Sequence, residues 1–267
     1  ALVGFQLVSF ALGEGKTAAG EVNIYSYRQE VLIWPLLDAF TARTGVKVNL
    51  VSGKADALLE RLKNEGANSP ADVLLTVDAG RLIRAKAAGV FQPVSSPVLK
   101  SVIPARYRDP EGHWFGLSLR SRVIFYAGDR VSPDELSSYE QLTDSKWRAR
   151  ICVRSSSNVY NQSLLASLVA HLGVDAAERW AHGLVANLAR KPQGGDRDQI
   201  KSVAAGECDL AIANTYYYVR MLKSGKEAER GAAEKVSLFW PNQNGRGAHV
   251  NISGAGVTVS AKNRENA

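Results

Sequence analysis

A regular alternation of extended and helical hydrophobic patterns constrains the fold of this chain more than any other feature. Residues 22–25 and 46–50 are predicted strands, and between them apolar side chains recur at helical spacing until Gly45. A second helical pattern over residues 55–64 leads to an apolar strand at residues 71–76. Strands and helices that alternate in this way form parallel sheets covered by helices, so we predict an α/β fold.

The pattern changes in the middle of the chain. Two extended segments, residues 113–119 and 122–126, follow one another with no helix between them. Such a pair is expected where a chain crosses from one lobe to another. The alternation restarts at residues 150–153, so we predict two hinge-linked lobes, each built on a doubly wound sheet. The predicted first lobe holds residues 21–122 and 247–267, and the predicted second lobe holds residues 123–246.

The two ends of the chain carry signals of their own. Residues 1–12 are mostly apolar and residues 17–20 are small, as in the back half of a secretory signal peptide. We interpret residues 1–20 as a signal-peptide remnant, which predicts an exported, periplasmic protein; an N-terminal helix or strand is the alternative. Residues 264–267 come directly after a strand pattern, and we expect the C-terminal closing helices to be missing.

The composition excludes a disordered chain. Hydrophobic residues make up 45% and charged residues 22% of the 267 positions, which are ordinary globular values. The net charge is +7, yet Lys and Arg are interleaved with Asp and Glu and form no run of five. This pattern favours a cationic surface over a nucleic-acid or membrane partner, and we expect no nucleic acid to bind.

The metal-binding and nucleophilic residue types form no familiar motif. Only two cysteines occur, Cys152 and Cys208, which excludes a disulfide scaffold and a four-cysteine metal site. Both lie in apolar strand patterns, so we predict two buried free thiols, with a bridge as the alternative if the strands are neighbours. The four histidines show no ligand spacing and are predicted to be structural.

A run of three tyrosines, residues 216–218, is the strongest functional signal. It follows a strand pattern at residues 209–213 and two N-cap residue types, Asn214 and Thr215, so the tyrosines are predicted on the first turn of a helix. Ligands bind at this edge of doubly wound sheets. Helical residues are about 100° apart, so the first two rings can enter one cleft while the third packs elsewhere.

The chemistry of these side chains points to a hard cation. A phenol has a pKa near 10, and a highly charged ion such as Fe³⁺ displaces its proton. A serine-rich helix start at residues 155–158 and the segment Ser26, Tyr27 and Arg28 offer amides and a guanidinium to a small anion. The alternatives are that the tyrosines serve packing or an interface, that the serines are a solvated cap, and that Arg28 pairs with a surface carboxylate.

Four segments together resemble a known family. They are residues 22–29, 69–76, 158–163 and 213–218, and they resemble the periplasmic ferric-iron-binding proteins of bacterial iron ABC transporters. The resemblance extends over nearly everything after residue 21 and implies a transferrin-like, type II periplasmic-binding fold. It also implies closure of the two lobes on the ligand.

The resemblance implies a set of site residues. Tyr160, Tyr216 and Tyr217 match the tyrosine ligands of the family. Gln29 stands where some members have a histidine, and Val77 stands where others have a glutamate. These differences favour the subgroup that completes the site with a synergistic anion, carbonate or bicarbonate. The implied anion-binding residues are Ser26, Tyr27, Arg28, Ser156, Ser157 and Asn158, with Gln29 and Asn214 behind the ligands.

The implied function is that of a monomeric periplasmic shuttle, which carries Fe³⁺ to an inner-membrane ABC permease and catalyses no reaction. One alternative is a receptor for an organic solute, such as a polyamine, a sugar phosphate or a phosphonate, on which the tyrosines stack. Another is a transferase on the same two-lobe fold. No acid/base pair and no nucleophile beside a base is apparent in the sequence, which argues against the enzyme.

Overall fold

A computed structural model of the protein describes residues 20–267, so the predicted signal-peptide remnant lies outside the described residues except for Gly20. The strands are β1 (Glu21–Ser26), β2 (Lys47–Ser52), β3 (Val73–Val77), β4 (Phe115–Ala127), β5 (Ile151–Cys152), β6 (Leu210–Asn214), β7 (Val236–Phe239) and β8 (Val250–Val257). The helices are α1 (Glu30–Thr44), α2 (Ala55–Glu65), α3 (Ala79–Ala87), α4 (Pro97–Val102), α5 (Val159–Leu172), α6 (Val174–Ala186), α7 (Asp196–Ala204), α8 (Thr215–Leu222) and α9 (Glu227–Glu234).

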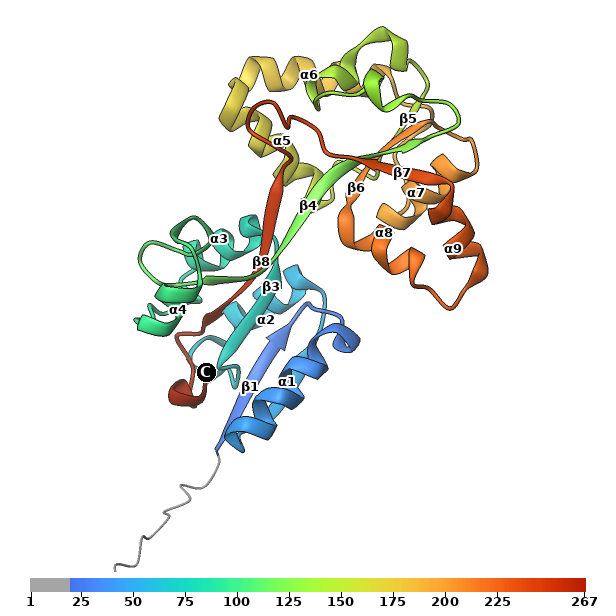
Figure 1. Cartoon of the computed structure of the whole chain (residues 1–267). Helices are drawn as coiled ribbons and strands as arrows, with labels where there is room; N and C mark the ends of the chain where they lie inside the picture. Colours follow the sequence, from blue (N-terminus) through green and yellow to red (C-terminus); the bar gives the residue numbers. More distant parts are fainter. Residues whose placement is uncertain (1–19) are drawn as a thin grey trace, which may run out of the picture.

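The described chain forms two bodies of sheet and helix that meet at a narrow waist (Figure 1). The first body contains β1, β2 and β3 with α1 to α4, and the second contains β5, β6 and β7 with α5 to α9. Strands β4 and β8 lie at the waist. This arrangement confirms the predicted two-lobe α/β fold.

The first body is a sheet with helices on both faces. β1 pairs in parallel with β2 and β3, and β8 adds to β3 in the antiparallel direction. Successive strand residues point to opposite faces. Ile24 accordingly packs with Ile33 and Leu37 of α1, while the next residue, Tyr25, packs with Leu58 of α2 and with α3. The apolar alternation in the sequence thus produces a doubly wound sheet.

Strand β4 belongs to both sheets. Its first half, through Ser121, pairs with β8, and its second half, from Arg122, pairs with β6 and β7. The two extended segments predicted as a crossover are therefore one continuous strand. The change of partners between residues 121 and 122 places the middle of β4 at the junction of the two bodies.

The second body repeats the layered plan. β6 lies between β5, with which it is parallel, and β4, with which it is antiparallel. Ile212 packs on one face with Leu164 and Leu168 of α5, and Ala211 and Ala213 pack on the other face with residues of α7 and α8. Because β5 and β6 run parallel, the helices that follow them, α5 and α8, start at one edge of the sheet.

The prediction of two free thiols was wrong in the structure. Cys152 ends β5 and Cys208 lies just before β6, and the two form a disulfide with Cα atoms 5.9 Å apart. The cause is the parallel pairing of these strands, in which Cys152 lies opposite Ala211. Spacing along the sequence carries no information on which strands become neighbours.

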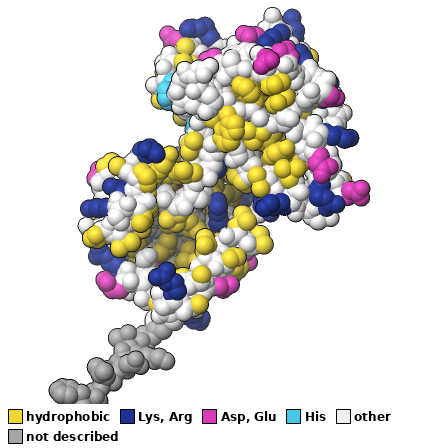
Figure 2. All heavy atoms as spheres, viewed as in Figure 1, with side chains coloured by type: hydrophobic (Ala, Val, Ile, Leu, Met, Phe, Trp, Pro, Cys, Tyr) yellow, Lys and Arg dark blue, Asp and Glu magenta, His cyan; other side chains and the backbone are white. Residues whose placement is uncertain are grey.

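The surface carries charges of both signs. Figure 2 shows Lys and Arg side chains spread over both bodies of the face in view, with hydrophobic side chains gathered near the waist and on the first body. Within residues 20–267, no helix has the length and hydrophobicity that crossing a membrane requires.

Candidate metal centre

A cavity of about 560 Å³ lies between the two bodies. The first body contributes the segment after β1, the end of β3 and the middle of β4, and the second body contributes the starts of α5 and α8. The lining residues that bear on its chemistry are Tyr27, Arg28, Gln29, Val77, Arg120, Tyr160, Tyr216, Tyr217 and Arg220.

The structure brings the three predicted tyrosine ligands together. The hydroxyl of Tyr216 donates to the hydroxyl of Tyr160 at 3.4 Å, and the rings of Tyr216 and Tyr217 lie 4.2 Å apart. Strands β5 and β6 are parallel neighbours, so the helices that follow them start at the same edge of the sheet. Residues more than fifty positions apart in the sequence meet for this reason.

The third tyrosine of the run packs elsewhere, as predicted. The hydroxyl of Tyr218 donates to the carbonyl of Val236 at 3.0 Å, and its ring centroid lies 5.3 Å from that of Phe125. Tyr218 therefore belongs to the core of the second body rather than to the cavity.

The two helix starts are capped differently. Asn158 caps α5, because its side chain accepts from the backbone amide of Tyr160 at 3.0 Å. Asn214 occupies the cap position of α8, but in the described structure its side chain makes no capping hydrogen bond. The sequence prediction of a side-chain cap at Asn214 was therefore wrong, and another contact must fix the first turn of α8.

The environment of the phenols keeps them protonated unless a cation displaces the proton. Burial raises the pKa of Tyr160, and the nearby Tyr217 raises it further. Burial raises the pKa of Tyr216 even more strongly, with added contributions from Tyr160 and Tyr217. A hard, highly charged cation is the kind of ligand that converts such phenols to phenolates.

The first body presents a guanidinium to the cavity. Arg28 donates to the hydroxyls of Ser253 at 3.1 Å and Ser118 at 3.5 Å, and its backbone amide donates to the hydroxyl of Ser26 at 3.0 Å. Ser26 is buried, so its hydroxyl shapes the loop rather than facing the cavity. Gln29 accepts from Arg220 of α8 at 2.8 Å, which joins the two bodies at the cavity.

The serine-rich segment before α5 is separate from the cavity. Within residues 20–267, Ser156, Ser157 and Asn158 are not among the residues that line it. The hydroxyl of Ser157 instead contacts that of Ser155 at 2.8 Å, and Asn158 serves as the helix cap. The structure therefore groups Tyr27, Arg28 and Gln29 with the tyrosines and leaves residues 156–158 outside.

Tyr27 is a fourth phenol on this cavity. The sequence placed its segment at the same cleft as Tyr160 and Tyr217 but assigned Tyr27 to the anion rather than to the metal. In the structure these three tyrosines share one apolar cluster with Val77 and Val159. Arg81 lies over the Tyr27 ring, with its guanidinium carbon 5.0 Å from the ring centroid.

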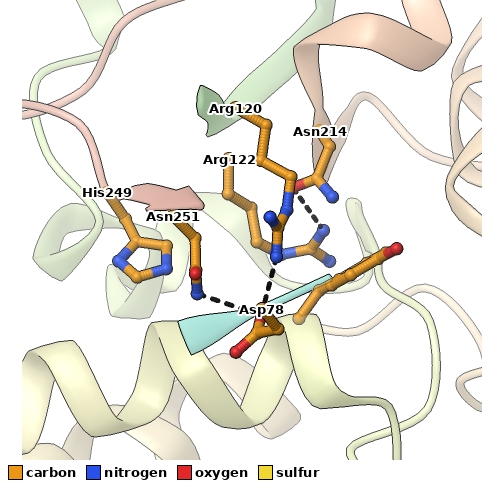
Figure 3. Close-up of a pocket in the computed structure, with 7 residues that line it drawn as sticks. Asp78, Arg120, Arg122, Asn214, His249 and Asn251 are labelled. Carbon is orange, nitrogen blue, oxygen red and sulfur yellow. Dashed lines mark hydrogen bonds and ion pairs between the residues drawn. The ribbon is translucent and has the colours of Figure 1, made fainter. Parts of the chain in front are cut away.

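A buried polar cluster lies next to the tyrosines at the waist (Figure 3). Arg120 of β4 donates to Asp78 at 2.9 Å, and its guanidinium carbon lies 5.2 Å from the centroid of the Tyr160 ring. Asp78 also accepts from Asn251 of β8 at 2.9 Å and from Ser163 of α5 at 2.5 Å. This carboxylate thus binds groups of both bodies at once.

His249 also lines this cluster. Burial lowers the pKa of His249 to about 4, and the nearby cations Arg122 and Arg120 lower it further, while Asp78 acts in the opposite direction. The imidazole is therefore neutral at neutral pH.

Sequence reasoning missed the buried charges around the tyrosines. Asp78 caps α3 by accepting from the amide of Gly80 at 3.1 Å, and its place before a helix gave no sign of its contact with Arg120. Arg120 and Arg122 stand at alternating positions of a strand, and charged residues inside an apolar strand were the available signal. Asp196 is the first residue of α7, a position that gave no sign that its side chain is fully buried.

A second group of potential metal ligands lies apart from the cavity. Asp109, Glu111 and His113 come together in the first body. The ammonium group of Lys86 already contacts Asp109 at 2.8 Å and Glu111 at 3.2 Å, so one cation offsets part of the negative charge of this group.

The fold and the cleft define a two-lobe solute-binding protein. The chain belongs to the family of bacterial extracellular solute-binding proteins, whose profile matches residues 68–267. This match and the iron-binding relatives together confirm the family predicted from the sequence.

Named relatives agree with this family. Iron uptake protein A1 of Synechocystis sp. (strain ATCC 27184 / PCC 6803 / Kazusa) is 56% identical over 92% of this chain and 69% of its own length. The major ferric iron-binding protein of Neisseria meningitidis serogroup B is 30% identical over 98% of this chain and 78% of its own. A Trichodesmium FutA structure in complex with iron and citrate superimposes with a TM-score of 0.90 at 55% identity, covering 92% of this chain and 78% of that one.

Proposed function

We propose that this protein binds Fe³⁺ as its cargo in the cleft between the two bodies, through the phenolates of Tyr160, Tyr216 and Tyr217. The observation that carries this proposal is the contact between the Tyr160 and Tyr216 hydroxyls, which come from two helices and meet at 3.4 Å in a cavity. Hard oxygen ligands suit a ferric ion. The names of the relatives, which include iron uptake and ferric iron-binding proteins, support the same cargo.

We assign the remaining coordination positions to Tyr27 or to an anion. An octahedral ion has six positions, of which three phenolates fill half. Tyr27 lines the cavity and offers a fourth phenolate, and Arg28 offers a guanidinium to a small anion beside it. Carbonate or bicarbonate fits this description, and so does a small carboxylate such as the citrate named with the Trichodesmium relative. We place the anion at Arg28 rather than at residues 156–158 because only Arg28 lines the cavity.

Binding is coupled to closure of the two bodies. The cavity has walls from both, and Gln29 and Ser163 each take part in a hydrogen bond between them. A ligand that contacts both walls stabilises the closed arrangement. We propose lobes of residues 21–122 with 247–267 and of residues 123–246, which are the ranges expected from the sequence.

Acid releases the cargo. Each phenol must lose a proton to bind iron, and burial holds the pKa of Tyr160 and Tyr216 above the ordinary value. Protons therefore compete with Fe³⁺ for these ligands, and the apparent affinity falls as the pH falls.

The protein acts as a carrier without catalysis. Membership of the solute-binding family implies that an inner-membrane ABC permease receives the cargo. The name of a Serratia marcescens relative, the Fe(3+)-binding periplasmic protein, supports export to the periplasm. We propose that the carrier works as a monomer, since both walls of the cleft come from one chain.

The test is a titration of the protein with ferric nitrilotriacetate, followed by visible absorption. A phenolate-to-iron band that saturates at one equivalent is expected. The Tyr216→Phe/Tyr217→Phe double variant should lose the band and the binding, while Tyr218→Phe, the matched control in the same run, should keep both. A folded double variant that keeps the phenolate-to-iron band and full iron affinity would contradict the proposal. Binding of a polyamine, a sugar phosphate or a phosphonate without a response to iron would support the organic-solute alternative.

A further inference from the structure

A buried carboxylate, that of Asp196, lies next to the proposed iron site but does not line the cavity. Asp196 is the first residue of α7, and its side chain is fully buried. It accepts from Arg122 at 3.0 Å, from Arg154 at 3.1 Å and from the backbone amide of Asn214 at 2.8 Å. Both of its oxygens are used, so the carboxylate is held on three sides.

One of these contacts leads to the tyrosine pair. Asn214 is the last residue of β6 and the cap residue of α8, where its side chain makes no capping bond in the described structure. Its amide is instead anchored on Asp196, two residues before Tyr216. The contact that fixes the first turn of α8 is therefore made by a residue of α7.

The other two contacts lead to Tyr160. The guanidinium of Arg154, which donates to Asp196, lies with its central carbon 5.4 Å from the centroid of the Tyr160 ring. Arg122 donates to the side-chain oxygen of Asn161, the neighbour of Tyr160, at 2.6 Å. Asn161 in turn donates to the carbonyl of Arg154 at 2.8 Å.

We propose that Asp196 is a positioning residue that holds Tyr160 in register with Tyr216 and Tyr217. Through Asn214 it fixes the start of α8, and through Arg122 and Arg154 it fixes the start of α5. This inference rests on the proposed function for its consequence, which is that iron affinity depends on a carboxylate that does not touch the iron. Groups behind metal ligands commonly change metal affinity by about 10–100-fold.

Stability alone is a weak reason for this arrangement. A buried ion pair loses hydration when the chain folds, and a well-packed apolar substitute is often as stable or more so. What an apolar side chain does not provide is three directed hydrogen bonds that tie two helix starts together. The ionic centre is therefore explained by the positions in which it holds the starts of α5 and α8.

The second body contains a matched control. Asp209, just before β6, also binds two arginines, with Arg130 Nε and Arg150 Nε each at 2.6 Å. It lies at the opposite end of β6 from Asn214, and its partners have no described contact with the three tyrosines within residues 20–267. Asp209→Asn removes the same charge from a similar centre away from the cavity.

The experiment compares Asp196→Asn, Arg154→Gln and Asp209→Asn with the unsubstituted chain in ferric nitrilotriacetate titrations. We expect affinity to fall about 100-fold for Asp196→Asn and about 10-fold for Arg154→Gln, and to stay unchanged for Asp209→Asn. The absorption band of Arg154→Gln should move to longer wavelength, because loss of the cation over the Tyr160 ring raises the energy of the phenolate electrons. The Arg154 side chain is 17% exposed, so its variant decides the question even if Asp196→Asn does not fold.

A second readout requires no iron. In chains labelled with 3-fluorotyrosine, Asp196→Asn should move or broaden the fluorine resonances of Tyr160 and Tyr216, and Asp209→Asn should leave them in place. Unchanged resonances together with unchanged affinity in Arg154→Gln would overturn the inference, as would equal losses in Asp196→Asn and Asp209→Asn. If the unsubstituted chain does not bind iron but the fluorine resonances move in Asp196→Asn, the proposed function is wrong and the positioning role of Asp196 is retained.

Discussion

Two arginines of one strand bind two buried carboxylates, and the two centres differ in what they connect. Arg120 and Arg122 stand two positions apart in β4, at the point where this strand passes from the first sheet to the second. Arg120 binds Asp78, which also accepts from Ser163 of the other body. Arg122 binds Asp196, whose other partners, Arg154 and Asn214, belong to the second body alone.

The two carboxylates therefore have different roles: one bears on closure of the two bodies and the other on the arrangement of the iron ligands. The bond between Ser163 and Asp78 spans the two bodies and must break if they move apart. Asp78 is also held at φ 84°, a conformation that few residues other than glycine adopt, so the surrounding contacts must offset its cost. Arg122 is the last residue of the proposed first lobe, but it pairs with Asn214 of β6, so the Asp196 centre moves with the second body. We conclude that Asp78 serves the joining of the bodies and Asp196 the arrangement of the ligands.

The largest expected effect follows from removing the Asp196 carboxylate. Asp196→Ala leaves Arg122 and Arg154 without their carboxylate, and the Arg122 side chain is fully buried. Breaking a buried pair in this way should lower the free energy of unfolding by about 3–5 kcal/mol in denaturant titrations. The control is Asp56→Ala, because this carboxylate, 68% exposed, also pairs with two arginines and should contribute at most about 1 kcal/mol. Equal losses would contradict the account.

The disulfide gives the next effect, confined to the second body. Cys152 and Cys208 enclose a separation of 56 residues, and the described first body has no cysteine. The Cys152→Ala/Cys208→Ala variant should lose about 2–4 kcal/mol of stability, measured by thermal or denaturant unfolding. Its iron affinity should stay unchanged, since the bridge lies at the strand ends away from the cavity lining. Two titratable thiols in the denatured, unreduced chain would instead restore the free-thiol prediction.

His249 provides a pH test at the boundary of the two centres. Its pKa is about 4 in the folded protein, below the ordinary value of 6.5, so the unfolded chain takes up the proton first as the pH falls. Stability is therefore complete above pH 6.5 and is lost between pH 6.5 and about 4, by on the order of 3 kcal/mol. His249→Gln should flatten this part of the stability curve. A slope that persists unchanged would assign it to other groups.

The smallest effect tests closure alone. Ser163→Ala removes one hydrogen bond to the Asp78 carboxylate, which is worth about 1.5 kcal/mol, and should speed iron release about tenfold. The free energy of unfolding in denaturant should change less than it does for Asp196→Ala. Ser167→Ala, one turn further along α5, is the matched control. Equal release rates in the two variants would remove Ser163 from the closing contact.

The predictable parts of the fold are the helices and strands whose apolar residues recur at a regular spacing in the sequence. Alternation of apolar residues located β1, β3 and β6, and the serine-rich segment before Val159 located the start of α5. Two short helices, α4 and α9, were missed because they bury few residues, with none buried in α4 and only Ala233 buried in α9. Local patterns identify elements whose faces the core covers and overlook those on the periphery.

The part of the candidate site that was predictable is the segment whose residue types suggest a ligand, the tyrosine run at residues 216–218. The tyrosine run indicated a hard cation only in combination with Tyr160 and with the segment beside Arg28, because three tyrosines alone are equally explained by packing. The role of Tyr27, the pairing of Cys152 with Cys208 and the links from Asp196 all depend on which strands become neighbours. That choice is made by long-range packing between residues tens of positions apart. A charged residue inside an apolar pattern, such as Arg122, was the one local sign of the buried centres.

Resonance Raman spectroscopy of the iron-loaded protein tests the central claim most directly, because excitation in the visible band enhances the vibrations of the ligands that produce it. The account predicts tyrosinate ring modes that weaken in Tyr160→Phe and persist in Tyr218→Phe. The hydroxyl of Tyr160 meets that of Tyr216 in the cavity, whereas that of Tyr218 binds the Val236 carbonyl. Tightly bound ferric iron without tyrosinate modes would contradict it.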